Sequence, residues 1–191
     1  MRIKILKSTP FGPVVILWSV FNDLPQITRV LISQPDYSAL AQVAHDYPEA
    51  QPSTCKEIDD IAADIKAFLE GEDISFPLNM MTLDKCPPFQ KAVLCADHSI
   101  PRGRVSTYQL IAMYLGKDQA ARAVGNALSN NPFPILIPCH RVIRSDGHLG
   151  GFRGGIMMKR ALLKNEGVSI GHDNGVLSNR IYYRNKKINK N

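Results

Sequence analysis

Cys139, His140 and Arg141 stand side by side, directly after Pro138. A free thiol has a pKa of about 8.5 and is mostly protonated at neutral pH, so an imidazole that accepts its proton turns it into a nucleophile. Adjacent side chains of an extended segment point to opposite faces, and we therefore expect a water molecule to bridge Cys139 and His140. An isolated Cys-His pair, however, more often marks a buried cysteine beside an incidental histidine.

The other three cysteines, Cys55, Cys86 and Cys95, do not form the dense, regular pattern of a disulfide scaffold. This usage indicates a reducing compartment, and we expect the cytoplasm, or the nucleus if the source is a eukaryote. The chain has no Cys-x-x-Cys pair, and His45 and His98 do not stand at ligand spacing. The sequence therefore predicts no structural metal.

The composition is that of a globular protein, with 45% apolar and 21% charged residues in a chain of 191. This length accommodates one ordinary domain or two small ones. The apolar run at residues 13–21 is too short to cross a bilayer, and no small-residue cleavage site follows it. We expect neither membrane insertion nor secretion.

Charge is distributed unevenly between the two halves of the chain. Residues 1–85 carry 7 basic and 12 acidic side chains, a balance of −5, whereas residues 86–191 carry 16 and 5, a balance of +11. A basic half can bind the phosphates of a nucleic acid, or it can simply keep the protein soluble. Charge alone does not decide between these interpretations.

The first third of the chain has the pattern of a small α/β domain. β-Branched residues between turn signals predict strands at Ile3–Leu6, Val14–Val20 and Thr28–Ile32, which we expect to form a small antiparallel sheet. Helices are predicted at Ser38–Tyr47 and Glu57–Glu70, the second from apolar residues at helical spacing that stop before a glycine. We predict a linker in 73–83 and a domain boundary between residues 82 and 83.

The rest of the chain is predicted to be mostly helical. A first helix starts at Pro87 and Pro88 and ends before Ile100. Ser106 and Gln109 have the spacing of a capping box for a second helix that runs to residue 115. We expect Asp118 to cap a third helix over 119–129, which completes a helix-turn-helix pattern.

The third of these helices carries very small side chains. Ala120, Ala121, Ala123, Gly125 and Ala127 leave little to stand off the backbone. Such a helix can approach another molecule closely, or it can be packed tightly in the core, which is the commoner use of small residues. The arginine at position 122 can enter a groove or fill the gap left by an extruded base, although most arginines cover a solvated face.

A longer string around the cysteine resembles a known family. Pro138-Cys139-His140-Arg141-Val142, with Ile135-Leu136-Ile137 before it and 150–155 after it, is closely similar to the O6-alkylguanine-DNA alkyltransferases, or methylated-DNA–protein-cysteine methyltransferases. The similarity extends over about 87–167 and includes 104–108, 121–125 and 165–167. The first domain resembles the family much more weakly.

This resemblance implies a role for each candidate residue. Cys139 would be the alkyl acceptor, His140 the base that deprotonates it through water, and Glu166 the carboxylate that orients the imidazole. Tyr108 would protonate or polarise the departing guanine, and Arg122 would replace the flipped base. Even with the resemblance, two alternatives stay open: Glu166 as a simple helix-end residue and Tyr108 as ordinary amphipathic packing. The other residues implied in DNA binding are Ala121, Ala123, Gly125, Asn131, Arg141 and Ser145. Asn131 would lie between the third helix and the cysteine segment, and Arg141 would be a structural cation that bridges them. The residues implied in the substrate pocket are Pro134, Val142, Phe152 and Arg153.

The resemblance also implies the fold, the partner and the reaction. We expect a ribonuclease-H-like α/β domain over 1–82, a mostly helical winged-helix or helix-turn-helix domain over 83–171, and a basic extension over 172–191. A monomer would bind duplex DNA containing O6-alkylguanine through the minor groove and transfer the alkyl group once, irreversibly, without metal or redox cofactor. Phe152 stands where the family often has tyrosine, and the zinc ligands found near the start of some relatives are absent.

Two other functions remain open at this stage. A non-catalytic lesion-binding protein of the same fold would recognise alkylated DNA without removing the alkyl group, although such relatives usually replace the cysteine. A helix-turn-helix transcription regulator would bind a sequence rather than a lesion. The fate of the alkyl group distinguishes the first of these from a transferase, and the determinant of binding distinguishes the second.

Overall fold

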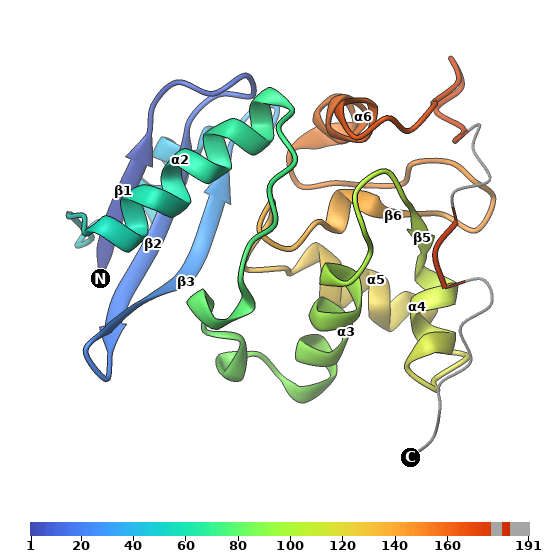
Figure 1. The fold of residues 1–191 in the computed structure, drawn as a ribbon, viewed down its shortest axis with the longest axis horizontal. Helices are drawn as coiled ribbons and strands as arrows, with labels where there is room; N and C mark the ends of the chain where they lie inside the picture. Colours follow the sequence, from blue (N-terminus) through green and yellow to red (C-terminus); the bar gives the residue numbers. More distant parts are fainter. Residues whose placement is uncertain (177–180, 184–191) are drawn as a thin grey trace. The chain divides into compact units, whose positions relative to one another are not determined.

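The computed structural model describes residues 1–176 and 181–183 (Figure 1). The chain forms two compact units, the first containing Met1–Lys85 together with Pro132–Leu136, and the second containing Cys86–Asn131 and Ile137–Asn191. The domain boundary predicted between residues 82 and 83 stays a prediction. No helix among the described residues is both long and apolar enough to cross a bilayer.

The first unit is built on a four-stranded sheet in the order β3-β2-β1-β4. Strands β1 (Arg2–Leu6), β2 (Val14–Phe21) and β3 (Leu24–Ile32) are antiparallel neighbours, as the sequence predicted. The expectation of a purely antiparallel sheet is wrong, because β4 (Gln51–Pro52) pairs parallel to β1. The sheet is therefore mixed.

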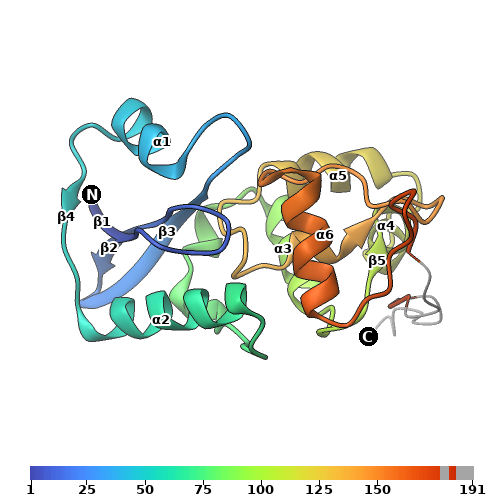
Figure 2. The same ribbon diagram turned by 90° about the horizontal axis from the view of Figure 1, so that it is seen from above.

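Helices α1 (Ala39–Asp46) and α2 (Lys56–Glu70) lie on opposite sides of this sheet (Figure 2). The central strand β2 is consequently apolar on both faces, with residues 14–18 all at most 2% exposed. The Ser38 hydroxyl caps α1 by accepting from the Ala41 amide, and Gly71 ends α2 in the left-handed conformation. Both helices match the predicted ranges to within a residue at each end.

The predicted linker is part of the first unit. Residues 73–83 include the short helix η1 (Leu78–Met80) and the first residue of a second short helix, η2 (Leu83–Lys85). Met81 forms a parallel bridge with Ile27, and Phe76 and Met81 are 4% exposed. The irregular sequence pattern did not indicate that these side chains are buried. Their burial holds residues 73–83 against the sheet.

The second unit contains α3 (Pro88–His98), α4 (Tyr108–Tyr114), α5 (Ala121–Ser129) and α6 (Gly155–Asn165). A short parallel pair, β5 (Ser106–Thr107) and β6 (Val142–Ile143), lies among them, as Figure 1 shows. The fold class is thus a mixed sheet with helices in one unit and a mostly helical second unit.

Both predicted helix caps in the helix-turn-helix region are wrong. Thr107, not Ser106, caps α4 by accepting from the Leu110 amide, while Ser106 lies in β5 and donates to the Tyr182 carbonyl. The helix α5 begins two residues later than predicted, after Ala120, so Asp118 is not its cap. The two helices nevertheless pack against each other around a turn, as expected.

A short segment near the chain's end packs against the second unit. Ile181 forms a parallel bridge with Val105, and the Tyr182 amide donates to the Val105 carbonyl at 2.7 Å. Tyr183 is 5% exposed and stacks on Tyr114 with ring centroids 4.1 Å apart. The predicted basic extension is only partly described, since its residues 177–180 and 184–191 lie outside the described residues.

Candidate active site

Cys139 lies on a 3-10 turn rather than on an extended segment. The turn, η3, covers Cys139–Arg141 and follows Pro138, whose carbonyl accepts from the Arg141 amide at 2.8 Å. The premise that Cys139 and His140 point to opposite faces of a strand is therefore wrong. Asn131 holds the start of the turn, because its Nδ2 lies 3.2 Å from the Ile137 carbonyl and 3.4 Å from Cys139 Sγ.

The next two residues of the turn converge on one carboxylate. His140 Nε2 lies 2.8 Å from Glu166 Oε1. Arg141 donates to the same carboxylate from Nε at 2.9 and 3.1 Å and from Nη2 at 2.9 Å. All three residues are at most 7% exposed. A buried guanidinium thus holds the carboxylate, and the carboxylate holds the imidazole.

This network determines the protonation states of Glu166 and His140. Burial raises the pKa of Glu166, but the hydrogen bonds and charges of His140 and Arg141 outweigh it and lower that pKa to about 2. Burial lowers the pKa of His140 more than Glu166 raises it. A neutral imidazole beside a carboxylate places its proton on Nε2, so the other ring nitrogen, Nδ1, has the lone pair that can act as a base.

The thiol of Cys139 has a strongly raised pKa. Desolvation by burial is the main cause and the charge of Asp97 the second, and together they bring this pKa to about 11. The hydrogen bond from Asn131 and the cations of Lys159 and Arg153 act in the opposite direction. The resting nucleophile is therefore a thiol, and its proton must be removed when it reacts.

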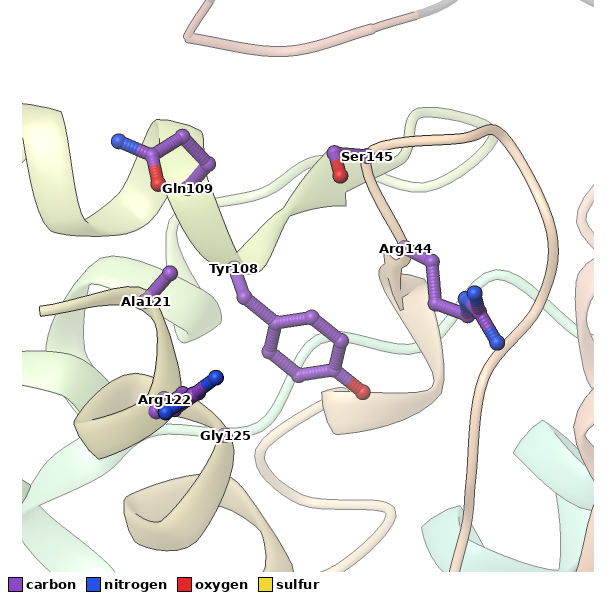
Figure 3. Close-up of a pocket in the computed structure, with 7 residues that line it drawn as sticks. All are labelled: Tyr108, Gln109, Ala121, Arg122, Gly125, Arg144 and Ser145. Atoms are coloured by element: carbon purple, nitrogen blue, oxygen red, sulfur yellow. The ribbon is translucent and has the colours of Figure 1, made fainter. Parts of the chain in front are cut away.

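An open cavity of about 730 Å³ lies beside Tyr108 (Figure 3). In this view the tyrosine ring stands between Arg122, which comes from α5, and Arg144, which comes from the loop after β6. Burial, and secondarily the nearby charge of Cys139, raise the pKa of Tyr108. The hydroxyl therefore stays protonated at neutral pH and can donate a hydrogen bond. The cavity is lined by Tyr108, Gln109, Ala121, Arg122, Gly125, Arg144 and Ser145.

The small residues of α5 are divided between two faces. Ala127 is 8% exposed and packs with Val124 and Leu128 in the core, as expected where small residues serve tight packing. Ala123 is exposed, and Ala121 and Gly125 are half-buried. A Cβ atom on Gly125 would stand 3.8 Å from the Tyr108 ring, an ordinary contact distance. The outer face of α5 is therefore flat beside the cavity, and Arg122 is its long side chain.

Arg141, implied both in DNA binding and as a structural cation, is buried in the structure. Besides the three hydrogen bonds to Glu166, its Nη1 donates to the Ile100 carbonyl at 2.6 Å. The guanidinium is thus enclosed between the turn after α3 and the end of α6, not between α5 and the cysteine segment. Arg141 stabilises the carboxylate rather than presenting a cation at the surface.

The four residues predicted to line the substrate pocket are not brought together around the described cavity. Phe152 lies edge-on to His140 with centroids 6.3 Å apart, and Arg153 donates to the Ser129 carbonyl at the end of α5. Val142 is fully buried in β6. Pro134 belongs to the first compact unit. Phe152 and Arg153 therefore remain the candidates near the reacting groups.

Two buried charged residues escaped the sequence analysis. Lys159 is fully buried, and its Nζ donates to the carbonyls of Val142 at 2.6 Å and Gly151 at 3.3 Å. Asp97 is also fully buried, on the apolar face of α3. The available signal was a charge at helical spacing within an apolar stripe: Asp97 follows Val93 and Leu94, and Lys159 precedes Leu162 and Leu163. Among the described residues, no group of three or more His, Cys, Asp or Glu could hold a metal ion.

Comparisons with known proteins agree on one family. Residues 88–168 match the model of the 6-O-methylguanine DNA methyltransferase DNA-binding domain. The methylated-DNA–protein-cysteine methyltransferase of Methanothermobacter thermautotrophicus is 46% identical over 106 residues, 56% of this chain and 59% of that protein. The namesake of Methanosarcina barkeri is 45% identical over 55% of this chain and 65% of its own length. The chain thus spans less than two thirds of either curated relative.

Solved structures extend the similarity to most of the chain. The Mycobacterium tuberculosis O6-methylguanine methyltransferase is 32% identical, with a TM-score of 0.67 over 86% of this chain and 90% of that one. The crystal structure of the OGT protein from the same organism in complex with DNA is 30% identical, with a TM-score of 0.68 over 87% and 92%. The chain belongs to the O6-methylguanine-DNA methyltransferase family.

Proposed function

We propose that this protein repairs double-stranded DNA by transferring the alkyl group of O6-alkylguanine, once and irreversibly, to its own Cys139. The observation that carries the proposal is the buried network in which Arg141 fixes Glu166 and Glu166 fixes His140, the residue directly after the nucleophile. The family, whose curated relatives are methylated-DNA–protein-cysteine methyltransferases, supports the same reaction.

The reaction begins with removal of the thiol proton. His140 Nδ1 takes this proton, through a water molecule, and the Glu166 carboxylate stabilises the imidazolium that forms. The Cys139 sulfur attacks the alkyl carbon in line, a C–S bond forms and the C–O bond to guanine breaks. The oxidation states do not change, so the step requires no redox cofactor. The thioether product does not release the alkyl group, and each molecule therefore acts once.

Tyr108 assists the leaving group in this proposal. Guanine departs with the electron pair of the broken bond, and its developing negative charge is stabilised by a hydrogen bond or proton from the Tyr108 hydroxyl. The raised pKa of this tyrosine keeps the donor proton in place. The cavity beside Tyr108, about 730 Å³ in volume, is large enough to admit a purine base.

The alkylated base can enter this cavity only after it has left the DNA helix. The alkylated oxygen lies inside the base stack, so the nucleotide must swing out of the helix before in-line attack. The flat face of α5 approaches the minor groove, and Arg122 fills the space that the base leaves. Ala121, Ala123, Gly125 and Ser145 contribute surface around that arginine, while Asn131 positions Cys139, and Phe152 and Arg153 border the reacting groups.

The finer assignments of fold and context accompany this proposal. We assign residues 1–82 to a ribonuclease-H-like domain, 83–171 to a winged-helix-like domain with the functional residues, and 172–191 to a basic extension. The protein would act as a monomer in the cytoplasm, or in the nucleus if eukaryotic. The described helix-turn-helix of α4 and α5 supports the DNA-binding part of this assignment.

Mass spectrometry of the protein after mixing with a duplex that contains one O6-methylguanine tests the reaction. The Cys139 peptide should gain one methyl group, with a stoichiometry of one per protein. Cys139→Ala should abolish the gain, and Cys95→Ala, which changes another free cysteine, should leave it intact. Lesion binding without any mass change would overturn transfer and favour the non-catalytic alternative.

A further inference from the structure

Asp97 is a buried carboxylate without a hydrogen-bonded counterpart. It is fully buried, and neither of its carboxylate oxygens has a hydrogen-bond partner in the described part of the chain. Its helix neighbours on the buried face, Val93, Leu94 and Ala96, are apolar. Burying a carboxylate without partners strongly disfavours its charged form. Such a group needs an explanation beyond packing.

The cations that could neutralise Asp97 are engaged elsewhere. Arg141 directs its guanidinium at Glu166 and the Ile100 carbonyl. Lys159 directs its ammonium at two backbone carbonyls. Both cations lower the pKa of Asp97 from a distance, but desolvation dominates and raises it to about 7. The carboxyl is therefore close to half-protonated under physiological conditions.

Asp97 also lies close to the reaction centre. The helix α3, which carries it, and the helix α6, which carries Lys159, both pack against the η3 turn that carries Cys139. Two cations face Asp97 across these contacts, Arg141 and Lys159, and both favour its charged form. The charge of Asp97 in turn disfavours the anionic forms of the other ionisable groups that face it, which are Cys139, Tyr108 and Tyr183. A thiolate and a carboxylate thus compete within one desolvated region.

We propose that Asp97 is a positioning residue that controls the reactivity of Cys139: the thiolate forms readily only while the Asp97 carboxyl holds a proton. Two negative charges close together in a dry environment repel each other, so ionisation of one suppresses ionisation of the other. Asp97 exchanges no proton with Cys139 in this account, and it acts only through its charge. This regulation acts on the nucleophile of the proposed function, and its biological meaning therefore rests on that function.

Alkylation of Cys139 by iodoacetamide measures thiolate formation without any DNA. The sulfur attacks the CH2 carbon and iodide leaves, and peptide mass spectrometry reports the label on Cys139 separately from the other cysteines. Asp97→Asn should shift the pH midpoint of labelling downward and speed labelling at pH 8 by about threefold to tenfold, as expected for loss of one nearby charge. Asp118→Asn, which removes an exposed carboxylate of the same unit, should change neither quantity.

A second variant protects the test against misfolding. Asp97→Leu also removes the charge and suits the apolar surroundings, so it should shift the midpoint in the same direction as Asp97→Asn. A midpoint equal to that of the Asp118→Asn control in both folded variants would overturn the proposal. Because the label reports the thiol alone, this outcome differs from failure of the proposed function, in which labelling shifts as expected but no methyl group is transferred from DNA.

Discussion

The Nε2 atom of His140 lies 2.8 Å from Oε1 of Glu166, and the two side chains are 0% and 2% exposed. This contact assigns the imidazole proton to Nε2 and leaves Nδ1 to act as the base. It also explains why Arg141 is buried, since a carboxylate in this environment needs a cation to remain charged. The catalytic proposal and the stability of the second unit therefore depend on the same few atoms.

Replacing Glu166 should affect both activity and stability. Glu166→Gln removes the charge that holds His140 and leaves the Arg141 guanidinium without its counterion, at a cost of about 3–5 kcal/mol in the free energy of unfolding. We expect the rate of methyl transfer to fall by about tenfold or more, because the imidazolium loses its stabilisation. Denaturant unfolding and single-turnover kinetics check the two effects. Glu70→Gln, an exposed acidic residue of α2, is the control and should be nearly neutral.

Arg122 should matter for the duplex and not for the chemistry. Arg122→Ala should slow transfer from O6-methylguanine in duplex DNA by about tenfold to a hundredfold, since an unfilled gap in the stack costs on the order of 1–3 kcal/mol. Transfer from the free O6-methylguanine base should be unaffected. Single-turnover rates with both substrates make the comparison, with Arg104→Ala as the exposed control. Equal slowing with duplex and free base would refute the proposed role.

Tyr183 should stabilise the second unit through its buried contacts. Its hydroxyl donates to the Ala96 carbonyl at 2.7 Å and lies 2.5 Å from Ser99 Oγ. Tyr183→Ala, which also removes the stack on Tyr114, should lower the free energy of unfolding by about 3–5 kcal/mol. Tyr183→Phe should cost only about 1 kcal/mol through the lost hydrogen bonds. An alanine variant as stable as the natural protein in urea would show that this segment does not contribute to the fold.

The stability of the protein should decrease between mildly acidic and neutral pH because of Asp97. Its pKa rises from 3.8 in the unfolded chain to about 7 in the folded protein, so between these values the folded state retains a proton that the unfolded state releases. This contribution to stability is complete below pH 3.8 and is lost as the pH rises through about 7. The loss amounts to about 4 kcal/mol.

Asp97→Asn removes this dependence. Thermal unfolding of the variant at pH 5 and pH 8 should differ by less than that of the natural protein, and the variant should be the more stable of the two at pH 8. Asp118→Asn should retain the natural pH dependence. Parallel stability curves for the natural protein and Asp97→Asn would show that Asp97 ionises normally in the folded state.

Local patterns in the sequence determined most of the secondary structure. Strand alternation and helical spacing place β1 to β3, α1 and α2 within a few residues of their observed bounds, because these signals depend on one buried face per element. The caps of α4 and α5 were harder to predict. Ser106 satisfies the capping-box spacing but is drawn into β5 by pairing with β6, a contact distant in sequence.

The sequence by itself also indicated the candidate residues for the chemistry. The string from Pro138 to Val142, with Glu166 and Tyr108, was sufficient to indicate the family and a cysteine nucleophile. Only the tertiary structure decided how those residues are arranged. It placed Cys139 on a turn, enclosed Arg141 against Glu166, and buried Asp97 and Lys159 in two helices that pack on that turn. Spacing along the chain reveals residue types and local periodicity, whereas burial and charge pairing arise only when distant segments meet and exclude water.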